Sequence, residues 1–200
     1  MKDIGGDFYD FNKISDNEVG ILVADVAGHG IPAALIASMG KLAFNQQQAI
    51  GRDAVGVLAG INDSLIQIQL SNNFLTASYT YLDLEGGKLY NANAGHPDLL
   101  VWKKAKQEML RHRPAGTILG VFPSESYDLV QLDLEPGDRI IVFTDCVIET
   151  TNAVDGDYGM DRFFDYIRDT QELTPAEFSE AFTEVLLDWS DSIEGLEDDL

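Results

Sequence analysis

The sequence has one cysteine, three histidines and no long hydrophobic run. A lone cysteine cannot form an internal disulfide, which fits a reducing compartment. No apolar stretch approaches the ~20 residues that a membrane-spanning helix needs. No basic segment followed by an apolar core opens the chain, as it would in a signal peptide. These absences predict a cytoplasmic domain that does not insert into a membrane.

Basic residues are scarce as well. The chain carries 13 lysines and arginines against 34 aspartates and glutamates, which gives a formal net charge of −21. Nucleic acids and anionic membrane surfaces are therefore poor partners unless a metal intervenes. A solvated surface accounts for most of this charge. The length of 200 residues and the hydrophobic fraction of 45% suit a single domain with a substantial core.

Several catalytic motifs are missing. A cysteine-based phosphatase needs an arginine six positions after its nucleophile, but Asn152 stands six positions after Cys146. The sequence has no G-x-x-x-x-G-K-[ST] loop, no H-E-x-x-H and no G-x-S-x-G. The three histidines, His29, His96 and His112, are scattered among expected loops, so we do not expect a histidine zinc site.

One segment matches the dinucleotide-binding pattern G-x-G-x-x-[GA], at residues 28–33. Asp25 directly precedes these glycines, where its charge would meet a pyrophosphate. The acidic residue expected ~20 positions later should end a second strand, whereas Asp53 begins a helical segment. We therefore set the dinucleotide interpretation aside.

Hydrophobic periodicity outlines an α+β layered domain. After a buried strand at 19–25, a helix is expected beyond Pro32, with Ile31, Leu35, Met39 and Leu42 on its apolar face. A second helix is expected from Asp53. The expected strands are 75–84 and 88–94 as a hairpin, 99–102, and a further pair, 127–132 and 139–143, with an irregular segment at 107–126. Residues 174–177, Thr-Pro-Ala-Glu, have the form of a capping box and open a late helix.

Two of the short apolar runs end in an aspartate. Residues 21–24 run into Asp25, and residues 140–144 run into Asp145. Further acidic clusters lie at residues 7–10 and 197–199. If these segments converge, several carboxylates share one cleft, and such carboxylates stay ionised only when a cation neutralises them. An all-oxygen ligand set favours Mg²⁺ or Mn²⁺ over zinc.

Five motifs, in this order along the chain, resemble those of the PPM family of metal-dependent serine/threonine protein phosphatases. They are residues 5–10 (Gly-Gly-Asp-Phe-Tyr-Asp), 25–30 (Asp-Val-Ala-Gly-His-Gly), 93–97 (Asn-Ala-Gly-His-Pro), 143–145 (Phe-Thr-Asp) and 198–199 (Asp-Asp). The closer match is to the bacterial branch that controls sporulation and stress-response sigma factors. The resemblance covers almost the whole chain.

The resemblance implies an α-β-β-α sandwich of two antiparallel sheets flanked by helices, with two Mn²⁺ or Mg²⁺ ions at one end. Carried over by position, Asp25 resembles the carboxylate that bridges both ions. The Val26 carbonyl and Asp7 would serve the second ion, while Asp145 and Asp198 would complete the first. Asp25 and Asp145 would be the catalytic carboxylates.

The activity implied is hydrolysis of phosphoserine or phosphothreonine by a metal-activated water, with no protein nucleophile. The implied substrate is a phosphorylated anti-sigma factor antagonist, and an upstream sensor domain in the parent chain would switch activity through the first two helices. The alternative is a catalytically weak or inactive domain of the same fold that binds a phosphoprotein or relays a signal.

The chain departs from the family pattern at three places. Cys146 replaces the glycine that usually follows the aspartate of the Thr-Asp motif; a small buried residue that packs like alanine is the simpler interpretation. The chain also starts just ahead of Gly5 and stops at Leu200. We therefore expect residues 1–200 to be a single phosphatase domain, trimmed at both ends, from a longer protein.

Overall fold

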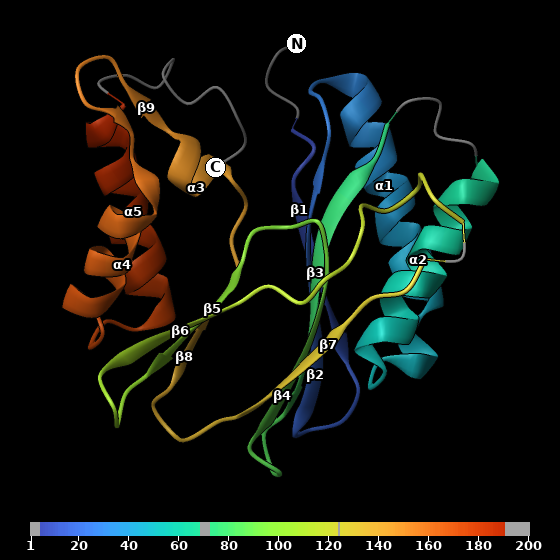
Figure 1. Cartoon of the computed structure of the whole chain (residues 1–200), viewed down its shortest axis with the longest axis horizontal. Helices are drawn as coiled ribbons and strands as arrows, with labels where there is room; N and C mark the ends of the chain where they lie inside the picture. The colour runs from blue at the N-terminus through green and yellow to red at the C-terminus, as the bar shows by residue number, and fades with distance from the viewer. Residues whose placement is uncertain (1–4, 69–72, 124, 191–200) are drawn as a thin grey trace.

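Two antiparallel sheets lie face to face between two pairs of helices (Figure 1). The computed structural model describes residues 5–68, 73–123 and 125–190. Helices α1 (Ile31–Gln46) and α2 (Ala54–Ile68) cover one sheet, whereas α4 (Gly159–Asp169) and α5 (Pro175–Trp189) cover the other. The predicted α-β-β-α sandwich is therefore confirmed.

The first sheet has five strands in the order β1-β2-β3-β4-β7, and the second has three in the order β6-β5-β8. The strands of the first sheet are β1 (Phe8–Lys13), β2 (Glu18–Val26), β3 (Leu75–Asp83), β4 (Lys88–Ala94) and β7 (Leu129–Asp133). The second sheet holds β5 (Leu99–Lys103), β6 (Glu108–His112) and β8 (Arg139–Ile141). The shorter elements are η1 (Gln48–Ile50), α3 (Cys146–Glu149), β9 (Thr151–Asn152) and β10 (Gly156–Asp157).

The structure corrects two predictions about strands. β7 and β8 do not pair with each other, because β7 pairs with β4 and β8 pairs with β5. The turn between them carries the chain from one sheet to the other, and Lys103 of β5 anchors this turn by an ion pair with Asp138. The segment 107–126, predicted to be irregular, contains β6, an edge strand of the second sheet.

The alternation of side chains along each strand separates two cores. In β2, Leu22, Ala24 and Val26 pack toward α1 and α2. Val19 and Ile21 point the other way and contact the core between the sheets. That inner core is built from apolar side chains of both sheets, including Leu82, Leu89, Leu99, Val101, Leu110, Leu132 and Ile140. Asp25 has the parity of Val19 and Ile21, so its side chain belongs to the inner face.

Of the four residues predicted on the buried face of α1, only Met39 packs against the core, where it is partly buried. Ile31, Leu35 and Leu42 are each more than half exposed, at 51%, 61% and 63%. The buried residues of α1 are mostly small: Ala33, Ile36, Gly40, Ala43 and Phe44. A Cβ on Gly40 would lie 2.8 Å from Leu75 Cδ2. Because α1 lies close to the sheet, small residues occupy much of its buried face. The spacing of large apolar side chains therefore predicted the wrong face.

The capping box that opens α5 is present as predicted. The Thr174 hydroxyl accepts a hydrogen bond from the Glu177 main-chain N–H, and the Glu177 carboxylate accepts one from the Thr174 main-chain N–H. Phe182 of this helix is buried against α4 and β5 in an aromatic core. Within the described residues, no helix is long and apolar enough to cross a membrane.

Candidate metal centre

One end of the sandwich gathers the strand ends that carry the predicted site residues. Asp7 directly precedes β1, and Asp25 is the penultimate residue of β2. β1 and β2 pair antiparallel with Phe8 opposite Ala24, so the next position along this register brings Asp7 opposite Asp25. Directly opposed side chains of antiparallel strands share a face, with Cβ atoms about 4.5–5.5 Å apart. Both carboxylates are half-buried, and continuation of the register by one residue beyond Phe8 would make them neighbours.

Gly6 keeps the Val26 carbonyl open at the same edge. A Cβ at position 6 would lie 2.9 Å from the Val26 carbonyl oxygen and 3.0 Å from the Val26 Cβ. A side chain there would crowd the oxygen that the sequence assigns to a metal. The lack of a side chain at position 6 therefore leaves the Val26 carbonyl oxygen accessible, as a metal ligand must be.

Asp145 comes to this end from the second sheet. It follows β8 and precedes α3, and its carbonyl oxygen accepts the main-chain N–H groups of Ile148 and Glu149 at 2.9 Å each. Cys146, next to it, is buried, and its Sγ lies 3.1 Å from the Thr144 hydroxyl oxygen. Cys146 therefore packs as a small side chain in the protein interior.

These donors suit Mg²⁺ or Mn²⁺, because they are carboxylate and carbonyl oxygens from neighbouring strand ends. Asp198 lies outside the described residues. Across residues 5–68, 73–123 and 125–190, no three His, Cys, Asp or Glu side chains are gathered closely enough to hold a metal ion. The assignment of Asp7, Asp25, Val26 and Asp145 as ligands remains a prediction.

His96 links the two sheets beside these carboxylates. Its Nδ1 lies 2.9 Å from the Thr76 hydroxyl oxygen, and Thr76 pairs with Asp25 across β2 and β3. The ring also lies beside the main chain of Phe143, two residues before Asp145, although its Nε2 makes no hydrogen bond of normal geometry with a described residue. His96 therefore lies between the strand that pairs with that of Asp25 and the segment that leads to Asp145.

The loop that presents His96 is held by Asn93. The Asn93 side chain accepts a hydrogen bond from the His96 main-chain N–H at 2.9 Å and donates to the carbonyls of His96 at 3.0 Å and Pro97 at 3.2 Å. The Asn93 side chain therefore orders the loop that presents His96.

The inner face turns from apolar to polar as it approaches the site. Asn91 donates hydrogen bonds to the hydroxyls of Ser78 and Thr80, at 2.9 and 3.0 Å, and all three residues are buried. Thr76 continues this row to the strand end. Thr76 is not among the site residues predicted from the sequence. The alternation of Thr76, Ser78 and Thr80 in an otherwise apolar strand was the signal that could have identified it.

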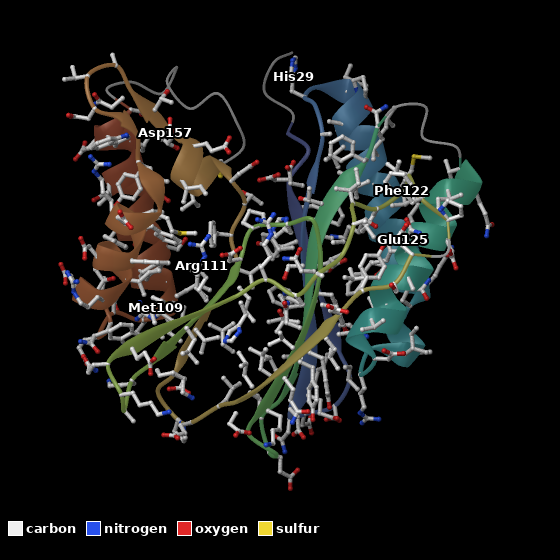
Figure 2. The ribbon with its side chains drawn as sticks, in the orientation of Figure 1. His29, Met109, Arg111, Phe122, Glu125 and Asp157 are labelled. Atoms are coloured by element: carbon white, nitrogen blue, oxygen red, sulfur yellow. The ribbon has the colours of Figure 1, made fainter. Side chains whose placement is uncertain are left out.

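His29 lies in the loop between β2 and α1. Its side chain is exposed, and Figure 2 shows it at the end of the molecule where α1 begins. The flanking glycines have positive φ values, 104° at Gly28 and 76° at Gly30, which only glycine adopts readily. Gly30 is the N-cap of α1, so the positive end of that helix dipole lies just beyond Asp25 and Val26.

The buried His96 makes stability depend on pH. Burial lowers the pKa of His96 to about 4, from 6.5, and the Phe143 main chain opposes this only in part while Arg113 adds to it. The unfolded chain therefore binds a proton between pH 6.5 and 4 that the folded protein does not bind. The contribution of His96 to the free energy of unfolding is fully present above pH 6.5. It is lost as the pH falls toward 4, by about 3 kcal/mol in total.

We expect His96→Gln to remove this part of the pH dependence. Urea unfolding of wild type and variant at pH 7 and pH 4.5 measures it. The matched control is His29→Gln, a change at an exposed loop position, which should keep the wild-type dependence. An unaltered acid-induced loss of stability in His96→Gln would contradict the assignment.

Comparison with known proteins agrees with this architecture. The family model of Stage II sporulation protein E (SpoIIE) matches residues 15–200. Phosphoserine phosphatase RsbU of Bacillus subtilis is 33% identical over 150 residues, which cover 74% of this chain and 44% of RsbU. Phosphoserine phosphatase RsbP of the same species is 28% identical over 153 residues, covering 74% and 38%. The chain thus spans less than half the length of these relatives.

The fold is shared with a solved phosphatase domain. The SiaA-PP2C domain of Pseudomonas aeruginosa superposes with a TM-score of 0.83 at 25% sequence identity, covering 93% of this chain and 74% of that domain. The family model covers well over half of the chain. The chain therefore belongs to the SpoIIE family of PPM-type, PP2C-like phosphatase domains.

Proposed function

We propose that this chain is the catalytic domain of a metal-dependent phosphoprotein phosphatase that hydrolyses phosphoserine or phosphothreonine. The observation that carries the proposal is the position of Asp25, on the inner face at the end of β2, with Asp7 opposite it and the Val26 carbonyl beside it. Two curated relatives, RsbU and RsbP, are phosphoserine phosphatases by name, which supports the choice of substrate residue.

The proposed ligands divide between two ions. Asp25 would bridge both, the Val26 carbonyl and Asp7 would hold one, and Asp145 and Asp198 would hold the other. Bound Mn²⁺ or Mg²⁺ in such a pair supplies a water of lowered pKa as nucleophile and neutralises the phosphoryl oxygens. This arrangement needs no nucleophilic side chain, which agrees with the burial of Cys146.

The remaining residues of the site would position its carboxylates. Thr76, opposite Asp25, and His96, beside the main chain of Phe143, would help to keep the end of β2 near the segment of Asp145, so that ligands from two sheets could act on one substrate. The polar row of Ser78, Thr80 and Asn91 rigidifies the inner face below them. Preorganised ligands need no rearrangement when the charge of the transition state develops.

The proposed substrate is a phosphorylated protein of the anti-sigma factor antagonist type, and the proposed parent chain carries a sensor domain upstream. Both rest on the resemblance to the sigma-factor branch of the family. The length of the relatives is consistent with further domains, since RsbU and RsbP are more than twice as long as the segment matched here.

We expect the domain to gain stability and activity from a divalent metal. A ligand that binds only the folded state stabilises it by about 2.7 kcal/mol at a hundredfold excess over the dissociation constant. Thermal melts in Mn²⁺, Mg²⁺ and EDTA measure the first effect, and hydrolysis of a phosphoserine peptide under the same conditions measures the second. Identical melts in metal and EDTA would contradict the metal site. Metal-stabilised protein without turnover would favour the alternative, an inactive phosphoprotein-binding domain.

A further inference from the structure

Positive charge is concentrated at one carboxylate near the site. Within the described part of the chain, Asp98 is the only carboxylate in an ion pair with two cationic side chains, Arg111 and Arg113. In each of the other ion pairs, the cation does not share its carboxylate with a second cation. Examples are Lys13–Asp16, Lys41–Asp10, Arg52–Glu18, Lys88–Asp133, Lys103–Asp138 and Lys104–Glu172. The surroundings of Asp98 therefore hold a local excess of one positive charge in a chain of net charge −21.

The two arginines are accessible, whereas their shared partner is not. The side chain of Asp98 is 6% exposed, but those of Arg111 and Arg113 are 54% and 57% exposed. A buried carboxylate thus anchors two guanidinium groups that still face solvent. Guanidinium groups held in place by one carboxylate keep N–H donors for another oxyanion, because each carries five.

A series of main-chain contacts connects the arginines to the candidate metal centre. Arg113 follows the end of β6, and its Nη2 lies 3.4 Å from the Gly95 carbonyl oxygen, to which it donates. Gly95 forms a bridge with Ala77, the neighbour of Thr76, and Thr76 faces Asp25. The arginine pair is therefore connected through two strand ends to the carboxylate that the proposed function uses.

The pair lies on a different face from Asp25. Arg111 pairs with Leu100, which packs with Met109 against α4 and α5, so Arg111 lies on the outer face of the second sheet (Figure 2). Asp25 lies on the inner face, between the sheets. A group bound by the arginines would thus lie to the side of the phosphoryl group that reacts at the metal centre.

We propose that Arg111 and Arg113 form a subsite for an acidic side chain that flanks the phosphoserine of the protein substrate. This inference rests on the proposed function and adds a substrate preference to it. An acidic segment is repelled by most of this protein, because the net charge is −21. Among the described residues near the site, the two arginines that share Asp98 would then determine which way the segment lies across it.

Two phosphoserine peptides of equal length, with glutamate or glutamine at the flanking positions, test the subsite. Wild type should favour the glutamate peptide by about fivefold in kcat/KM at low salt, as expected for exposed ion pairs, and lose the preference at high salt. Arg111→Gln/Arg113→Gln should bring the ratio of the two peptides close to one.

Lys104→Gln is the matched control. Lys104 is also a partly exposed cation, and it forms an ion pair with Glu172. It lies in the turn between β5 and β6, at the end of those strands opposite to Arg111 and Arg113. It should leave the ratio unchanged. An unchanged ratio in the double arginine variant, or an equal loss of preference in Lys104→Gln, would overturn the subsite.

Binding of fluorescent versions of both peptides in EDTA separates this inference from the proposed function. A glutamate preference that disappears in the double arginine variant, without turnover by wild type under any metal, would support the subsite and contradict the phosphatase assignment. Equal binding of both peptides by wild type, together with equal turnover, would overturn the subsite and leave the phosphatase assignment intact.

Discussion

Asparagine in place of Asp25 is expected to lower phosphatase turnover by about a hundredfold or more, and to weaken divalent metal binding. Replacing a residue that only orients a metal ligand already lowers metal affinity or activity by about 10–100-fold. Asp25 is itself the proposed ligand of both ions. Asparagine keeps the size of the side chain and removes its charge. Initial rates on a phosphoserine peptide across a Mn²⁺ titration measure turnover and metal affinity together.

Asp133→Asn is the matched control for this experiment. Asp133 is also an aspartate near the end of a strand in the first sheet, but it pairs with Lys88, at the end of β4 opposite to Ala94. Its replacement should leave turnover and metal affinity near the wild-type values. Turnover of Asp25→Asn close to wild type at saturating Mn²⁺ would show that the ligand assignment is wrong.

Lys103→Met is expected to destabilise the fold by about 3–5 kcal/mol, because it leaves a buried charge without its partner. The side chains of Lys103 and Asp138 are 7% and 2% exposed and form an ion pair. Lys103 Nζ also donates to the Asp133 carbonyl at 2.9 Å. Burial would raise the pKa of Asp138, but its hydrogen bonds with Lys103 and with the N–H groups of Glu135 and Lys104 keep that pKa below its usual value.

Urea unfolding at pH 7 measures this loss, and two further variants interpret it. Lys88→Met removes a partly exposed lysine from an ion pair with the exposed Asp133 and should change stability little, because water screens that pair. The double variant Lys103→Met/Asp138→Asn removes both charges of the buried pair and should recover part of the loss. Equal stability of Lys103→Met and Lys88→Met would contradict a special role for the buried pair.

The buried pair lies at the turn where the predicted pairing of β7 with β8 was wrong. A Glu-Pro-Gly-Asp segment between two apolar runs is a normal hairpin signal. Here the chain leaves β7 in one sheet and enters β8 in the other, and Asp138 forms an ion pair with Lys103 of the second sheet. Local turn chemistry does not specify which strand a segment will pair with, because the partner comes from a distant part of the chain.

The sequence alone determined the features that depend on near neighbours. The capping box at Thr174 and Glu177 involves residues three apart, so it could be recognised and was confirmed. The strand that ends near Asp25 followed from a run of apolar residues. The family followed from five motifs in a fixed order, each of them a short local pattern.

Only the tertiary structure decided the features that depend on contacts between distant segments. It buried the small residues of α1, since the sheet approaches Gly40 too closely for a side chain. It placed His96 against Thr76, twenty positions away, and gave Arg111 and Arg113 one carboxylate to share. Such pairings depend on strand register and on the distance between layers. Both are fixed by the packing of the whole core, so no local pattern in the sequence encodes them.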